Sequence, residues 1–227
     1  IRDRRNTLKV GVIASAMMLL LAACAVPTTQ HVGQSSAGMF FDLPREWSSI
    51  SAPVLKKAQS SWTSSDGGQA YVDALKWQGV WSPQSELSPL VAFGNDAPDV
   101  PVVYAAVRTL YDVETQNISS DTLSALQDVV IPVSSSNAGD GLDIQMNQSY
   151  LQNSLNAVRQ KLSWNAGGVR QTIDTRIVLG KKNNVVYIFW VRCSDTCRTA
   201  HANAIAGALK SLTCLLYTSP SPRDVEE

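Results

Sequence analysis

The sequence predicts an α+β domain built on an antiparallel sheet with helices packed against it. Segments rich in β-branched and aromatic residues recur between residues 39 and 191, and a turn sequence joins the last two of them. An amphipathic helix pattern follows the last of these segments. The chain has 227 residues, of which 44% are hydrophobic, so it can form one domain with a buried core and appendages at the ends. We expect that domain to occupy residues 39–213.

The charge balance excludes some classes of function. The chain carries 19 basic and 19 acidic side chains, and no basic block occurs in it. Nucleic-acid binding needs clustered Lys and Arg, so no nucleic-acid partner is expected. His31 and His201 are the only histidines, which excludes a three-histidine zinc site, and no metal or cofactor is expected.

Residues 1–23 have the layout of a signal peptide. Four basic residues within 2–9 precede an apolar segment, Val10–Ala23, which ends directly before Cys24. As a helix this segment would be about 21 Å long, which is short for a bilayer core of about 30 Å. A plain secretory signal with a chance cysteine at the cleavage site is the alternative.

The residues Ala22-Ala23-Cys24 resemble the bacterial lipobox, whose cysteine is diacylated on sulfur and becomes the mature N-terminus. The resemblance implies that Cys24 carries fatty acids such as palmitate and is an anchor, not a catalyst. Two or three acyl chains would hold the protein stably at the extracytoplasmic face of a cell membrane.

Two further segments are predicted to lie outside the domain. Residues 24–38 are small and polar after the cysteine, and are expected to form a flexible tether in which His31 is solvated. Residues 214–227 resemble translated sequencing-adapter read-through and are expected to be non-native. The start at Ile1 suggests a fragment or a non-standard start codon.

The first half of the domain is predicted to alternate strands with short helices. Met39–Trp47 is an apolar strand stopped by a proline turn, and a polar loop through Pro98 precedes a strand of β-branched and aromatic residues. Ser119, Ser120 and Asp121 are candidate N-caps. The other expected elements are a helix at Val54–Trp62, strands at Trp77–Trp81 and Pro101–Tyr111, and a helix from the caps through Val130.

The second half is predicted to hold a helix, a hairpin and a final helix. Leu151, Leu155, Val158 and Leu162 recur at intervals of four, three and four, which is typical of one helix face ending before Gly167-Gly168. The other expected elements are a loop at Ser134–Gly141, a half-buried strand at Val169–Leu179, a turn at Gly180–Asn184, a central strand at Val185–Val191, and a helix at Thr199–Leu212 with Ala202, Ile205, Leu209 and Leu212 on the sheet.

This order of elements resembles the α/β/α sandwich of PsbP-like proteins, including the LpqN-type lipoproteins of actinobacteria. Such domains open with a strand running into Leu-Pro-x-x-Trp, here Leu43–Trp47. They close with a long hairpin and a helix ending in Ser-Leu, here residues 169–191 and then Ser211-Leu212. The resemblance covers roughly residues 39–213. It implies an envelope location and an accessory, assembly or binding role, and it carries no catalytic motif.

Cys193 and Cys197 are the cysteine pair of the exported domain and are expected to form a structural disulfide, because thiols oxidise beyond the membrane. Closing this five-residue loop contributes about 2 kcal/mol by the loop-entropy estimate. A soft-metal site formed by both cysteines and His201, at intervals of four, is the alternative. By default His201 is a solvated helix residue.

Six tryptophans could line a ligand groove, although large aromatic residues are more often part of a core. Trp77 and Trp81 are the candidates for facing a ligand. The sequence lacks a Gly-x-Ser-x-Gly elbow and a Gly-rich phosphate loop.

We therefore expect a non-enzymatic, lipid-anchored envelope protein that binds a protein partner through an exposed apolar patch. A carrier of a lipid or other apolar envelope molecule is the first alternative, and it needs a cavity of about 300–1,000 Å³ lined by aromatic residues. A cell-wall hydrolase is the second, and it needs two carboxylates about 5–9.5 Å apart across a cleft.

Overall fold

The computed structural model describes residues 28–62, 66–89, 99–119, 122–123, 126, 141–166 and 168–214. Among these residues, no helix is both long and apolar enough to cross a lipid bilayer. The strands are β1 (Thr29–Gln34), β2 (Met39–Pro44), β3 (Ser48–Ile50), β4 (Leu75–Ser82), β5 (Val102–Thr109), β6 (Asp143–Gln152), β7 (Leu155–Ala166), β8 (Val169–Leu179), β9 (Val185–Ser194) and β10 (Thr213–Cys214). The helices are α2 (Ala52–Trp62), α3 (Asp66–Ala74), α5 (Asp112–Gln116), α7 (Asp195–Ala200) and α8 (Ala202–Ser211).

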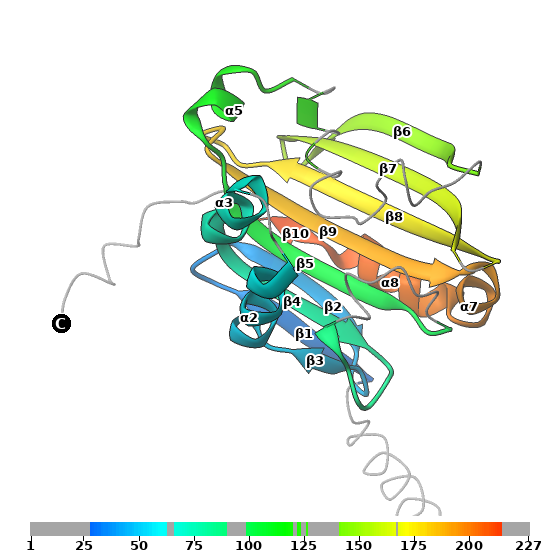
Figure 1. Cartoon of the computed structure of the whole chain (residues 1–227). Helices are drawn as coiled ribbons and strands as arrows, with labels where there is room; N and C mark the ends of the chain where they lie inside the picture. The colour runs from blue at the N-terminus through cyan, green and yellow to red at the C-terminus, as the bar shows by residue number, and fades with distance from the viewer. Residues whose placement is uncertain are drawn as a thin grey trace, which may run out of the picture.

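Seven of these strands form an antiparallel sheet in the order β3-β4-β5-β9-β8-β7-β6 (Figure 1). The predicted central strand is confirmed, because β9 is fourth of the seven and pairs with β5 and β8. The predicted turn after β8 is confirmed as well: the amide of Gly180 donates to the carbonyl of Val185 at 2.8 Å, and Asn183 has a positive φ of 54°.

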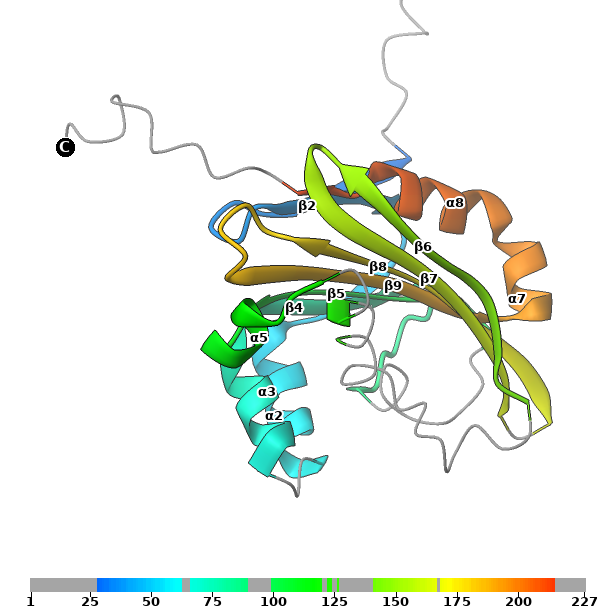
Figure 2. The ribbon, with the colours of Figure 1, turned by 90° about the horizontal axis from the view of Figure 1, so that it is seen from above.

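Layers on both faces of the sheet make the α+β prediction correct (Figure 2). Helices α2 and α3 pack on one face, where Leu55 and Val72 join Tyr104 and Trp190 in one buried cluster. The other face carries helix α8 together with a second sheet of order β1-β2-β10. Residues of β5 and β9 alternate between the two clusters, so both faces of the central strands are buried.

The predicted tether is wrong for residues 29–38. Strand β1 pairs with β2 from Thr29 to Gln34, and a turn at residues 35–38 joins them. His31 is exposed, but it contacts the neighbouring strand: its Nδ1 lies 2.7 Å from Oδ1 of Asp42, and its ring stacks on Phe40. The polar composition of β1 fits a strand at the edge of its sheet with alternating exposed and half-buried side chains.

The helix predicted around Leu151–Leu162 is also wrong, because this segment is the hairpin of β6 and β7. Asn153 and Ser154 form its turn with positive φ values of 50° and 66°, which suit a two-residue hairpin turn. Leu155 belongs to the cluster on the α8 face, whereas Val158 belongs to the cluster on the α2 face. Leu155 therefore lies on the opposite face from Val158, and the four side chains do not share the single face that their spacing suggested.

Smaller corrections concern the ends of other elements. Tyr71 lies in α3, a helix absent from the prediction, and α5 was missed as well. The amide of Thr122 donates to Oγ of Ser119 at 3.2 Å, as expected for an N-cap, while the helix expected beyond it lies mostly outside the described residues. Ala202 is exposed, so Ile205, Ala208 and Leu209 form the buried face of α8. Cys214, assigned to a non-native tail, pairs with Met39 and is buried.

Candidate functional site

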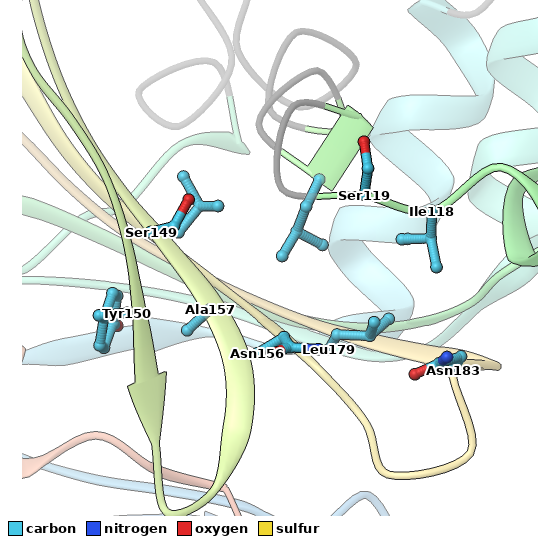
Figure 3. A pocket seen from close by; sticks show the side chains of 10 residues that line it. Ile118, Ser119, Ser149, Tyr150, Asn156, Ala157, Leu179 and Asn183 are labelled. Atoms are coloured by element: carbon cyan, nitrogen blue, oxygen red, sulfur yellow. The ribbon is translucent and has the colours of Figure 1, made fainter.

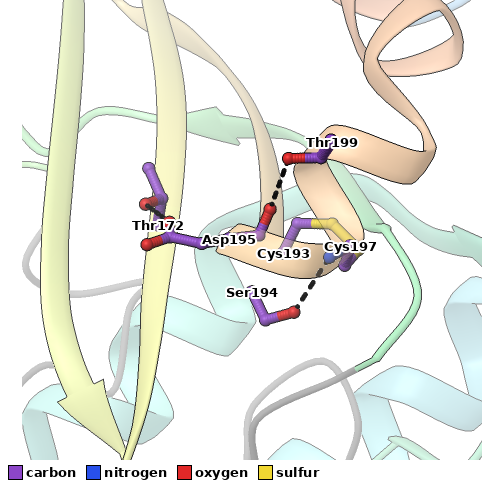
Figure 4. The surroundings of a disulfide bond; sticks show 6 residues. All are labelled: Thr172, Cys193, Ser194, Asp195, Cys197 and Thr199. Carbon is purple, nitrogen blue, oxygen red and sulfur yellow. Dashed lines mark hydrogen bonds between the residues drawn. A yellow bond between two sulfur atoms is a disulfide. The ribbon is translucent and has the colours of Figure 1, made fainter.

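The structure places the predicted cysteine pair at the junction of β9 and α7 (Figure 4). Cys193 and Cys197 form a disulfide with a Cα–Cα distance of 5.6 Å, and both are buried. Ser194 begins α7 by accepting the amide hydrogen of Cys197 at 3.1 Å. The two sulfur atoms are bonded to each other, so they are not thiolate ligands for a metal with His201. Residues 1–27, including Cys24, lie outside the described part of the chain.

Trp77 and Trp81 lie side by side on β4, with ring centroids 6.0 Å apart. Trp81 is only 7% exposed and packs edge-on against Phe41 of β2. It is therefore a core residue, and the expected role in facing a ligand is wrong for it. Trp77 is half-buried against the same cluster. Neither residue lines the cavities described below.

The feature that stands out as a binding surface is β6, at one end of the large sheet. It is ten residues long, and no described strand pairs with its outer edge. After Asp143 it contains no charged residue and no proline. Proteins usually protect such edges with short strands, charges or proline. The opposite edge follows that rule, because β3 has only three residues.

Two exposed apolar side chains flank this edge. Ile144 is 61% exposed and Leu151 is 69% exposed. Their cross-strand partners are Leu162 and Asn156, which places both side chains on the α2 and α3 side of the sheet. A register shift between Ile144 and Met146 bulges the strand near its start and leaves Met146–Gln152 regularly paired. An exposed apolar patch was predicted from the sequence, but its position was not.

A cavity of about 280 Å³ adjoins the C-terminal half of β6 (Figure 3). Its walls come from β6 and β7, the end of β8, the turn after β8, and the segment after α5. Its lining residues include no charged group: Ile118, Ser119, Leu123, Ser149, Tyr150, Asn156, Ala157, Val158, Leu179 and Asn183. A second hollow of about 270 Å³ shares Asn156, Leu179 and Asn183 with it and continues toward Lys181.

This cavity does not match the requirement of the carrier alternative. It is slightly smaller than the 300–1,000 Å³ typical of small-molecule sites, and its one aromatic lining residue, Tyr150, packs its side chain with the cluster on the α8 face. A larger groove of about 450 Å³ lies on the other face, under α8, and has a charged lining. It holds one carboxylate, Asp174, so the described cavities give no support to the facing carboxylate pair of a hydrolase.

Sequence reasoning missed this site because it assigned Leu151–Leu162 to a helix. The run Ile144–Gln152, which has no charge, and the turn-forming Asn153-Ser154 were signals of a hairpin. The edge position of β6 had no local signal, because it depends on which strands pair elsewhere in the sheet.

Comparison with solved structures shows a PsbP-like fold. No protein-family model and no curated protein matches the sequence. The structure is similar to that of the cyanobacterial PsbP (CyanoP) of Synechocystis sp. PCC 6803, with a TM-score of 0.52 at 8% identity over 85% of this chain and 96% of that chain. Weaker likenesses include LpqN of Mycobacterium tuberculosis, described as involved in cell envelope biogenesis, with a TM-score of 0.44 at 14% identity over 82% of this chain and 89% of that chain. They also include the Ran-binding protein Mog1p of Saccharomyces cerevisiae, with a TM-score of 0.45 at 10% identity over 83% and 96% of the chains.

Proposed function

We propose that the chain is a lipid-anchored cell-envelope protein whose domain is a non-enzymatic module that binds an extended segment of a partner protein. The observation that carries this proposal is the long edge of β6, with which no strand of the described residues pairs. An edge strand offers a row of free backbone N–H and C=O groups, and an added strand satisfies them without requiring a particular sequence. Side-chain pockets beside the edge then supply specificity.

The energetics require contributions from side chains as well as from the backbone. About five backbone hydrogen bonds to β6, at about 1 kcal/mol each, would offset only the low end of the 4–15 kcal/mol cost of association. Burial of an Ile or Leu side chain contributes about 1.5–3 kcal/mol. Ile144, Leu151 and the cavity lined by Val158 and Leu179 are therefore expected to supply most of the net affinity.

Anchoring through Cys24 is supported by the signal layout of residues 1–23 and by the lipobox-like Ala22-Ala23-Cys24. The test is metabolic labelling with a palmitate analogue in the wild-type chain and in Cys24→Ala. Label is expected only in the wild type, and the variant should keep its leader. Equal labelling of the two chains would end the lipoprotein proposal without touching the binding proposal.

Binding at β6 is tested by photo-crosslinking in cells, with a photoreactive residue at exposed Gln148 of the full chain. We expect one crosslinked product with an envelope protein, and its loss when Ile144→Lys and Leu151→Lys are combined in the same chain. Val113→Lys is the matched control, because Val113 is an equally exposed apolar residue on α5, outside the site. Its product should persist.

Three outcomes would contradict this proposal. A product that survives Ile144→Lys with Leu151→Lys would show that capture does not depend on the β6 surface. A product formed only with a second copy of the chain would make this edge a self-association interface. Crosslinking to lipid alone would assign the surface to the membrane.

A further inference from the structure

A second site lies on the opposite face of the large sheet, between helix α8 and strands β7 and β8. The groove has a volume of about 450 Å³. Helix α8 supplies the apolar side chains and Lys210, and the other charged side chains come from β7, β8 and α7. The lining residues are Arg159, Asp174, Arg176, Arg198, Ala202, Ile205, Ala206, Leu209 and Lys210.

The single carboxylate of the groove is already fully engaged. Asp174 is 1% exposed, and both of its oxygens accept hydrogen bonds from Arg159, at 3.0 Å from Nε and 2.6 Å from Nη2. These hydrogen bonds are the main reason why the pKa of Arg159 is raised. Arg176, Arg198 and Lys210 then remain as three positive charges without a negative partner among the groove's lining residues.

Arg176 occupies an unfavourable position unless a further anion is present. It lies directly opposite Arg159 in the pairing of β7 and β8, where like charges destabilise a sheet. Its Nε is buried without a hydrogen-bond partner in the described structure. Nη1 of Arg198 is in the same condition. Buried donors are normally satisfied, so two unpaired guanidinium donors lining one groove indicate a missing acceptor.

We propose that this groove binds a phosphate group carried on an organic molecule. Guanidinium groups match phosphate oxygens in shape and charge, and can donate to them in pairs. The three uncompensated cations suit an anionic phosphate better than a single carboxylate. Ile205 and Leu209 beside them would contact the carbon skeleton that bears the phosphate. A lipid headgroup and a soluble phosphoester present the same chemistry.

The test is isothermal titration calorimetry of the full chain in a neutral detergent with three soluble probes: inorganic phosphate, dihexanoyl phosphatidylglycerol and zwitterionic dihexanoyl phosphatidylcholine. We expect saturable binding of phosphate, of phosphatidylglycerol, or of both, and weaker binding of phosphatidylcholine. Arg176→Gln and Arg198→Gln should each weaken the anionic probes about tenfold. Lys57→Gln removes an equal charge from exposed α2 and should leave binding unchanged.

The probes distinguish the source of the phosphate. Binding of phosphatidylglycerol alone indicates a lipid headgroup, and comparable binding of inorganic phosphate indicates a soluble ligand. Thermal unfolding checks that each variant is folded. If Arg176→Gln does not fold, the binding measured with Arg198→Gln decides the result. The proposal would be overturned if neither anionic probe gave saturable heat up to about 10 mM, a concentration well above a Kd of 1 mM. Unchanged binding in the folded variants would overturn it as well.

Discussion

The ion pair of buried Arg108 with partly exposed Glu114 is the clearest case in which single side chains determine stability. Arg108 on β5 is 2% exposed, and its two terminal nitrogens donate to the two Glu114 oxygens at 2.9 and 2.7 Å. Burial alone would raise the pKa of Glu114. The hydrogen bonds from Arg108 and from the amide of Tyr111 outweigh burial and lower that pKa. Loss of Glu114 would leave a buried positive charge uncompensated.

We predict that Glu114→Gln lowers the free energy of unfolding at pH 7 by about 2–3 kcal/mol. This loss is smaller than for most fully buried ion pairs, because the Glu114 side chain is 25% exposed. The folded-state pKa is lowered, so the contribution is complete above the usual pKa of 4.5 and is lost as pH falls through the folded value. Urea unfolding at several pH values should show wild type and variant converging as the pH falls below 4.5 and through the lowered folded-state pKa. A difference in the free energy of unfolding that stays constant with pH would contradict this prediction. The control is Glu46→Gln, because Glu46 is exposed.

Cys214 gives a second test at the scale of one residue. Burial raises the pKa of its thiol to about 12, and the side chain is 1% exposed. We predict that iodoacetamide at pH 8 alkylates this cysteine about a thousandfold more slowly in the native chain than in denaturant, because the reactive thiolate is rare. Peptide mass spectrometry measures the rates. Rapid native alkylation would show that Thr213–Cys214 does not pair with β2 in solution.

At the scale of elements, the hairpin of β6 and β7 shows where pattern reasoning fails. Spacings of four, three and four fit a helix, and they also fit a strand whose two faces are both buried. Leu155 faces the α8 layer, whereas Val158 and Leu162 face the α2 layer, so these apolar residues serve two different buried faces. Leu151 is apolar although it is exposed at the edge. The spacing of apolar residues distinguishes a helix from a strand only when one face of the element is buried.

The turn of this hairpin predicts a stabilising substitution. Ser154 has a φ of 66°, a left-handed conformation that costs a residue with a side chain about 1–2 kcal/mol. Ser154→Gly should therefore raise the free energy of unfolding. The gain should be only about 1 kcal/mol, because the greater freedom of glycine in the unfolded chain offsets part of the relieved strain. Urea denaturation measures the change, and Ser154→Ala, which keeps a Cβ, should give none. Destabilisation by glycine would show that the turn has another conformation.

At the scale of the whole molecule, the fold class was predictable and the binding surfaces were not. The run from Val185 to Val191 identified a central strand because both of its faces needed apolar residues, and the structure confirms it. The groove under α8 joins Arg159, Arg176 and Arg198 from three elements. Nothing local to any of these arginines indicates the other two, because the pairing of β7 with β8 and the packing of α7 bring them together.

The small sheet is expected to unfold together with the large one. Phe41 of β2 contacts Phe189 of β9 and Trp81 of β4, with ring centroids 5.0 and 5.2 Å apart. We predict that Phe41→Ala costs about 3–5 kcal/mol and that tryptophan fluorescence and circular dichroism still report one transition. Two separated transitions would show that strands β1, β2 and β10 fold independently.

The start of β1 at Thr29 has a consequence for where this domain could work. Five Cα steps separate Cys24 from Thr29, and together they span at most about 18 Å. If acyl chains are attached at Cys24, the folded body stays next to the lipid headgroups and cannot extend outward across the envelope. Any protein it captures must then bring its own extended segment to within one domain diameter of the bilayer.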